Sequence, residues 1–216
     1  MPGRGARAAS PRAQALRRAA QRAAGQPRVS GAGGTILVVS GPSGVGKSSV
    51  CERLVAGGYA QLSISATTRA PRGEERHGVE YYFLEVDEFR RRIDADRFLE
   101  WAQVHGETYY GTPREPVEEA LAAGKVVLLD IDVQGAQLLR EQGLPLLTVF
   151  LKPPSLDELR RRLEGRGDTE PEEIERRMRF AEAEVREGWR YDLVLTNHEL
   201  ERTQAALLAY LGCLES

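Results

Sequence analysis

The stretch "VVSGPSGVGKSSV", residues 38–50, connects an apolar run to a segment of helical spacing through a loop rich in glycine and serine. Gly41 is followed by four residues and then by Gly46, Lys47 and Ser48, which is the spacing G-x-x-x-x-G-K-[ST] of a phosphate-binding loop. Glycines allow backbone N–H groups to turn towards an anion, and the following helix directs its positive end at the same point. The stretch therefore predicts a site for a nucleoside triphosphate.

The residues of this loop have separate expected roles. Lys47 is expected to reach the terminal phosphates, and the Ser48 hydroxyl is expected to hold Mg²⁺. The residues expected to bind the triphosphate are Gly41, Pro42, Ser43, Gly44, Val45, Gly46, Lys47, Ser48 and Ser49. A glycine-rich turn without a ligand is the alternative, which the complete motif disfavours.

Apolar runs rich in β-branched residues alternate with segments of helical period, which predicts an α/β fold with a parallel sheet flanked by helices. The strands are expected at 35–40, 125–132, 146–151 and 191–197. The helices are expected at 47–56, 113–123, 134–141, 156–163, 171–187 and 199–214, with Ser155 as an N-cap.

Two segments interrupt this alternation within what the length predicts to be one compact domain. An irregular passage begins at Gln61, and residues 66–112 form a mixed α+β insertion of short strands, turns and one short helix. Residues 161–178 join two amphipathic helices through a turn with glycines and arginines, as a mobile lid would. The core is expected to comprise 34–65, 113–160 and 179–216.

The charge is distributed unevenly along the chain. Residues 1–30 contain seven arginines and no acidic residue, and removing them from the 30 basic residues leaves 23 against 32 acidic residues. An acidic body argues against a protein that binds nucleic acid along its surface. Residues 1–33 are predicted to be a disordered tail, which is inert, binds nucleic acid or acts as a targeting segment.

Other features of the composition indicate a cytoplasmic protein. No run of 18 apolar residues exists, so no membrane partner is expected. Cys51 and Cys213 have no zinc spacing, which favours a reducing compartment, and Cys51 is expected to be a small buried residue. The three histidines form no metal-ligand pattern.

The insertion contains a candidate for a second anion site. In "TTRAPRGEERHGVEYYF", residues 67–83, Arg69 and Arg72 are spaced like two donors that converge on one phosphate. Tyr81 could add a hydroxyl. The alternative is that these charges only solvate the surface.

Six motifs, in order, resemble the guanylate kinase family from about Thr35 to the C-terminus. They are "SGPSGVGKSS", "SISATTRAPR", "FLEWAQVHGETYYGT", "LLDIDVQGA", "RRLEGRG" and "YDLVLTN". The resemblance implies a P-loop NTPase fold with a GMP-binding insertion and a helical lid. It also implies transfer of the γ-phosphate of ATP to GMP, with Mg²⁺ as cofactor, in purine nucleotide metabolism.

The resemblance assigns roles to individual residues. The phosphate of GMP would be bound by Arg69, Arg72, Tyr81 and Tyr110. The guanine pocket would comprise Ser65, Glu100, Thr112 and Asp132, with Glu75 as a supporting ligand. Catalysis would depend on Lys47 and on the lid arginines Arg162, Arg166 and Arg177. Asn197 would lie beside the adenine, and Asp130 would orient the Mg²⁺ shell.

Two stretches depart from the family's usual pattern. In "RGEE", Glu74 occupies the position of a glycine, while Glu75 keeps the usual spacing of the glutamate. The turn "HGETYYGT", residues 105–112, is one residue longer than usual, so Tyr109 could take the part of Tyr110.

Alternative functions depend on the same motifs. A non-catalytic scaffold domain of this fold would lack the complete phosphate-binding loop. A kinase of another phosphate, such as a ribose bisphosphate kinase, would lack the paired carboxylates Glu100 and Asp132. At the level of single residues, Glu100 could only pair with an arginine of the insertion, and Asp132 could only cap the helix near Gln134.

Overall fold

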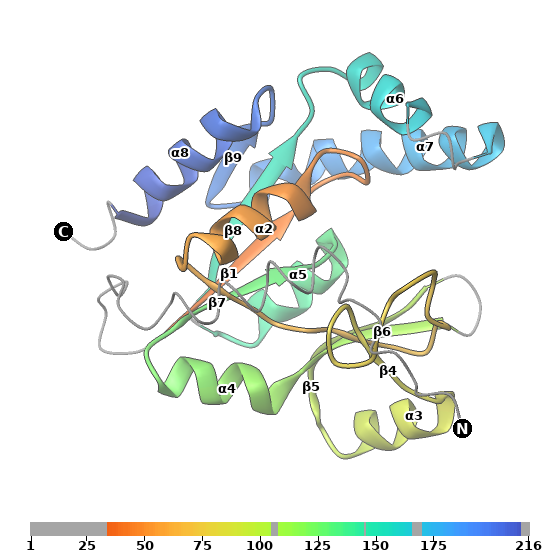
Figure 1. Ribbon diagram of the computed structural model, residues 1–216, viewed down its shortest axis with the longest axis vertical. Helices are drawn as coiled ribbons and strands as arrows, with labels where there is room; N and C mark the ends of the chain where they lie inside the picture. Colours follow the sequence, from red (N-terminus) through yellow and green to blue (C-terminus); the bar gives the residue numbers. More distant parts are fainter. Residues whose placement is uncertain (1–33, 105–107, 145, 166–169, 213–216) are drawn as a thin grey trace, which may run out of the picture.

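Two β-sheets organise the part of the chain that the computed structural model describes, residues 34–104, 108–144, 146–165 and 170–212 (Figure 1). The larger sheet is parallel, with the strand order β2-β7-β1-β8-β9. Its strands are β1 (Thr35–Ser40), β2 (Gln61–Leu62), β7 (Val126–Asp130), β8 (Leu146–Lys152) and β9 (Leu193–Thr196). The predicted α/β class and parallel sheet are confirmed.

Helices cover both faces of this sheet. They are α2 (Lys47–Ala56), α4 (Arg114–Ala122), α5 (Val133–Glu141), α6 (Leu156–Glu164), α7 (Pro171–Glu187) and α8 (Leu200–Gly212), with the short 3₁₀ helix η2 (Gly188–Arg190). Leu37 and Val39 of β1 pack with α2, α6, α7 and α8, whereas Ile36 and Val38 pack with α4 and α5. β1 is therefore buried on both faces, as its unbroken apolar run predicted.

The expected helix bounds agree with the structure to within one residue, apart from the expected end at 214, which lies outside the described residues. Ser155 caps α6 as predicted, because its side chain accepts a hydrogen bond from the Glu158 N–H at 3.1 Å. Cys51 of α2 is buried in the apolar cluster, as expected.

The smaller sheet belongs to the insertion. Its strands, in the order β4-β3-β6-β5, are β3 (Ala66–Thr67), β4 (Tyr82–Phe83), β5 (Phe98–Val104) and β6 (Thr108–Pro113), and its helix is α3 (Val86–Asp94). The insertion has its own apolar cluster, in which Phe89 stacks on Phe98 at 4.3 Å between ring centroids and on Tyr109 at 5.4 Å. Its mixed character matches the expectation.

One strand of the larger sheet was missed by the sequence prediction. Gln61 and Leu62, assigned above to the start of the irregular passage, pair with Val127 and Leu128 as the edge strand β2. Two residues contain too little of an apolar pattern to reveal a strand.

The segment expected to form a lid packs against the core in this structure. Leu163, Ile174 and Met178 lie in the same apolar cluster as β1, and Arg160 of α6 forms an ion pair with Glu175 of α7. In Figure 1, α6 and α7 lie at the top and the insertion lies at the lower right. In the described residues, no helix is long and apolar enough to span a bilayer.

Candidate active site

The phosphate-binding loop lies where it was expected, between the carboxyl end of β1 and the first residue of α2. Gly41, Gly44 and Gly46 all have positive φ, and a Cβ on Gly41 would lie 2.2 Å from the Leu151 carbonyl oxygen. The loop conformation therefore depends on glycine at these positions. The Lys47 Nζ donates to the carbonyl oxygens of Gly41 at 2.5 Å and of Pro42 at 3.1 Å, so the lysine lies along the inside of its own loop.

The residues expected to hold Mg²⁺ lie beside this loop. The Ser48 Oγ is 3.5 Å from an oxygen of Asp130, at the carboxyl end of β7, which is the strand next to β1. A hydroxyl and a carboxylate at the edge of a phosphate site are the hard oxygen ligands that Mg²⁺ takes in such sites. The residue types and their placement therefore fit the ion.

Glu100, Thr112 and Asp132 converge as expected. The register of β5 and β6 pairs Glu100 with Thr112, whose hydroxyl donates to the Glu100 carboxylate at 2.5 Å. A Cβ on Gly135 would lie 3.0 Å from Glu100 Oε2, and the Gly135 N–H donates to Asp132 Oδ1 at 2.9 Å. The first turn of α5 thus brings the two carboxylates together. The pairing of Ala66 with Gly111 also places Ser65 opposite Thr112.

Glu100 is only 8% exposed, and this burial raises its pKa to about 7. The hydrogen bond from Thr112 opposes the shift, whereas the nearby Asp132 carboxylate adds to it. These contacts also test the two alternative interpretations, that Asp132 only caps a helix and that Glu100 only pairs with an arginine. Asp132 does cap α5, but within the described chain Glu100 pairs with no arginine.

A pH dependence of stability follows from the buried carboxyl group. Its pKa is higher in the folded protein than in the unfolded chain, so its contribution to stability is present below about pH 4.5 and is lost as the pH rises through about 7. We expect Glu100→Gln to remove this dependence. Thermal unfolding of both proteins between pH 5 and pH 8 would show it, and parallel curves would contradict the shift.

The second anion site has its expected centre at Arg69. Its guanidinium donates to both oxygens of Glu75, at 2.8 Å and 3.1 Å, and lies 5.3 Å from the centroid of the Tyr81 ring. The Glu75 carboxylate raises the pKa of Arg69, and Arg69 lowers the pKa of Glu75. Arg72 is exposed, and its backbone N–H donates to Glu75 at 2.8 Å. Glu75 therefore supports the arginine pair.

Both departures from the family pattern can be followed in the structure. Glu74 is exposed and Gly73 has a φ of 54°, while Glu75 reaches Arg69 despite the changed order of residues. The ring of Tyr110 lies 6.1 Å from that of Tyr81, whereas Tyr109 is buried against Phe89. Tyr110 is thus the tyrosine on the side of the anion site. Residues 105–107 lie outside the described chain.

The expected lid arginines are held by glutamates of their own helices. The Arg162 Nε donates to Glu158 at 3.0 Å, and the Arg177 Nε donates to Glu173 at 2.9 Å. The Arg162 Nη2 also donates to the Asn197 carbonyl oxygen at 3.2 Å, which links α6 to the end of β9. Arg166 lies outside the described residues.

The sequence prediction missed residues next to the phosphate-binding loop. Glu184 of α7 interacts electrostatically with Lys47 and Asp132; burial raises its pKa, and Lys47 opposes the shift. Thr203 of α8 is buried and donates to the Asn197 side chain at 2.8 Å. A polar residue on the face that α8 buries with Leu207 and Leu211 was the available signal.

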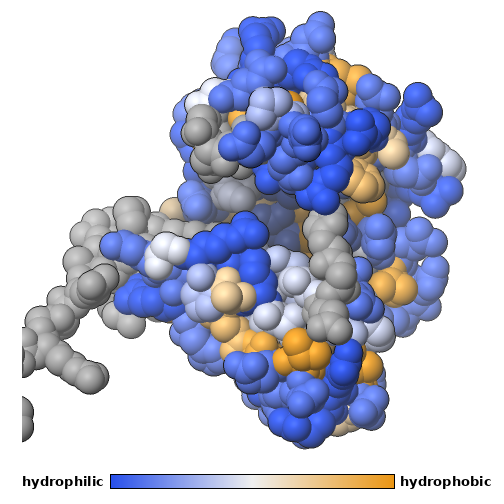
Figure 2. All heavy atoms as spheres, turned by 90° about the vertical axis from the view of Figure 1, so that its right-hand side faces the viewer, coloured by the Kyte–Doolittle hydropathy of each residue, from blue (hydrophilic) through white to orange (hydrophobic). Residues whose placement is uncertain are grey.

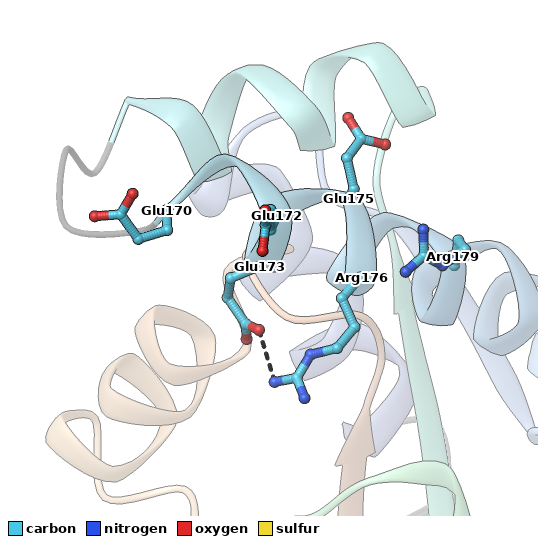
Figure 3. A pocket seen from close by; sticks show the side chains of 6 residues that line it. All are labelled: Glu170, Glu172, Glu173, Glu175, Arg176 and Arg179. Atoms are coloured by element: carbon cyan, nitrogen blue, oxygen red, sulfur yellow. Dashed lines mark ion pairs between the residues drawn. The ribbon is translucent and has the colours of Figure 1, made fainter.

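Two hollows differ in their relation to these residues. Figure 2 shows one between the region of α6 and α7 above and the insertion below. Another, of about 640 Å³, lies along α7, and Figure 3 shows that charged side chains of this helix and Glu170 line it. The hollow along α7 contains none of the predicted site residues, so it is not a candidate for the active site.

Comparison with known proteins shows the family of this chain. The family model described as guanylate kinase matches residues 33–212. This chain belongs to the guanylate kinase family. As a member of that family it is a nucleoside monophosphate kinase, with the P-loop NTPase type of fold that the sequence predicted.

Individual members of the guanylate kinase family are similar to this chain over most of their own length. The guanylate kinase of Symbiobacterium thermophilum is 48% identical over 179 residues, which cover 82% of this chain and 84% of the relative. That of Geobacter sulfurreducens is 46% identical over 171 residues, or 78% and 83%. The crystal structure of guanylate kinase from Anaplasma phagocytophilum has a TM-score of 0.68 at 32% identity and covers 87% of this chain and 89% of that one.

Proposed function

We propose that the named site residues carry out transfer of the γ-phosphate from ATP to GMP in one in-line step. A phosphate oxygen of GMP forms a bond to the γ-phosphorus as the bond to the β,γ-bridging oxygen breaks, which gives GDP and ADP. No covalent intermediate with the protein is needed. The observation that carries this assignment is the convergence of Glu100, Thr112 and Asp132 beside a phosphate-binding loop.

The acceptor half recognises the base and the phosphate of GMP separately. Guanine presents N1–H and its 2-amino group as adjacent donors, which suit the carboxylates of Glu100 and Asp132. The Ser65 hydroxyl donates to an acceptor atom of guanine, and the Thr112 hydroxyl, which here donates to Glu100, would turn from that carboxylate to do the same. The phosphate binds to Arg69, Arg72, Tyr81 and Tyr110, with Glu75 fixing the arginine geometry. The contact of Arg69 with Glu75 supports this, because it orients the guanidinium.

The donor half binds the triphosphate of ATP through the loop from Gly41 to Ser49. On binding, Lys47 exchanges the loop carbonyls that it now contacts for phosphate oxygens. Ser48 and Asp130 would hold Mg²⁺, in part through water, and the ion would neutralise phosphate charge. The assignment of Asn197 to the adenine rests on the family resemblance, because its side-chain amide here contacts Val45 and Thr203.

The lid arginines complete the charge around the transferring group. Arg162 and Arg177 turn from Glu158 and Glu173 towards the phosphates, and the resemblance assigns the same role to Arg166, which lies outside the described residues. This movement excludes water and so protects ATP from hydrolysis. The cytoplasmic location expected from the sequence stays a prediction.

Substrate choice tests this function. We expect a coupled assay of ADP release to give the highest kcat/KM with GMP, and rates lower by orders of magnitude with AMP, dTMP and ribose bisphosphate. Each wrong acceptor leaves buried polar groups of the guanine pocket unpaired. Equal rates with AMP would contradict the pocket, and activity with ribose phosphates alone would favour the rival kinase.

A further inference from the structure

Asn197 lies at a junction of three elements behind the phosphate-binding loop. The side chain is buried, and its Nδ2 donates to the Val45 carbonyl oxygen in the loop at 2.7 Å. Its backbone N–H donates to the Lys152 carbonyl oxygen at 2.9 Å, and its own carbonyl oxygen accepts from Arg162. Contacts from β8 and from the lid helix α6 therefore hold the backbone of Asn197, while its side-chain amide reaches the loop.

Thr203 of α8 holds the other end of this amide. Its Oγ1 donates to Asn197 Oδ1 at 2.8 Å, and the residue is 3% exposed among apolar neighbours of its helix. Only the NH₂ end of the amide can donate to the Val45 carbonyl oxygen, so this contact fixes which end of the amide faces the loop. The Thr203 hydroxyl must then donate to the oxygen end.

The amide packs directly on the last glycine of the loop. A Cβ on Gly46 would lie 2.6 Å from Asn197 Nδ2, and Gly46, with a φ of 99°, is the N-cap of α2. Backbone N–H groups at this point bind phosphate in such loops. A shift of the amide would therefore change the position of groups that contact the nucleotide.

We propose that the Thr203–Asn197 pair holds the phosphate-binding loop in the conformation that receives the donor's phosphates. Thr203 is a positioning residue, because it acts through Asn197 and Val45. Without its hydroxyl, the amide loses one of its two fixed ends and the loop spends less time in the competent conformation, which lowers the apparent affinity of the donor site. The inference rests on the proposed function only in calling this loop the donor site.

The test compares Thr203→Val, which keeps the shape but removes the hydroxyl, with Thr203→Ser, which keeps the hydroxyl. We expect Thr203→Val to weaken ADP binding, measured by calorimetry, and to raise the KM for ATP by about tenfold, the effect of about one lost hydrogen bond. The KM for GMP should stay within about twofold of wild type, and Thr203→Ser should restore ADP binding. If Thr203→Val does not fold, Thr203→Ala takes its place.

Thr148 supplies the matched control. It is also buried; its hydroxyl donates to Asp192 at 2.7 Å and accepts from the Arg140 guanidinium and the Asp192 backbone N–H, so Thr148→Val removes at least as many hydrogen bonds, all of them outside the loop. We expect Thr148→Val to lower thermal stability without changing ADP affinity. Equal losses for ADP and GMP in Thr203→Val, no rescue by serine, or the same ADP effect in Thr148→Val would overturn the proposal. A wild-type protein that binds ADP but does not phosphorylate GMP would instead refute the proposed function.

Discussion

Lys47→Met is expected to lower turnover by on the order of 10²–10³-fold, the typical effect of removing one charged donor from a transition state. Lys47 lies inside the phosphate-binding loop, where it can replace contacts to loop carbonyls by contacts to the transferring phosphate. GMP binding should remain measurable, because Arg69 and Glu100 lie in the insertion that contains the smaller sheet, away from the phosphate-binding loop in the chain. Steady-state rates and calorimetry with GMP give the two quantities.

Lys125→Met is the control for this experiment. Lys125 immediately precedes β7, and its Nζ donates to the exposed Gln61 side chain at 3.0 Å. The Lys125→Met variant loses the same positive charge as Lys47→Met, and its turnover should match that of wild type. Loss of GMP and ADP binding together in Lys47→Met would show that the two sites are not separable.

Glu100→Gln is expected to lower kcat/KM for GMP by about 10–100-fold, while the KM for ATP stays near that of wild type. A hydrogen bond to a charged group contributes about 1.5–3 kcal/mol, which corresponds to this range. The amide also adds a donor that faces N1–H or the 2-amino group of guanine. Discrimination between GMP and AMP should therefore shrink, which competition in the coupled assay would measure.

Glu88→Gln controls for a lost carboxylate in the same insertion. Glu88 of α3 pairs with Arg91 and Arg92 near the surface, so its replacement should leave kcat/KM for GMP unchanged. If GMP turnover survived in Glu100→Gln and ATP binding weakened instead, the guanine pocket would be assigned to the wrong residues.

The features predicted best are those set by neighbours in the sequence. The loop from Gly41 to Ser48 combines glycines, a lysine and flanking elements in one stretch, and the bounds of α2 and α7 follow from their apolar spacing and from Gly46 and Pro171. β2 was missed because its two residues are a strand only through pairing with β7. The extended conformation of these two residues is stabilised by tertiary contacts and not by their local sequence.

The arrangement of the acceptor site could not be derived from local patterns. Glu100 and Asp132 are 32 positions apart, and only the family resemblance placed them together before the register of β5 and the first turn of α5 did so. Thr203 was missed for a related reason. Its partner Asn197 is near in sequence, but the side-chain amide of Asn197 contacts Val45, which is 152 positions away in the chain.

The proposed guanine pocket is divided between the two sheets. Glu100 and Thr112 belong to the small sheet with its own apolar cluster, whereas Asp132 follows β7 of the large one. A base that bonds to both carboxylates would restrict the motion of the two sheets relative to each other, beyond the restriction already set by Leu99 of β5, which packs in an apolar cluster of the large sheet. The first nucleotide then bears most of the ordering entropy, and the second binds a more rigid molecule. Positive cooperativity between the two substrates would thus arise from the position of one carboxylate, without any contact between their bases.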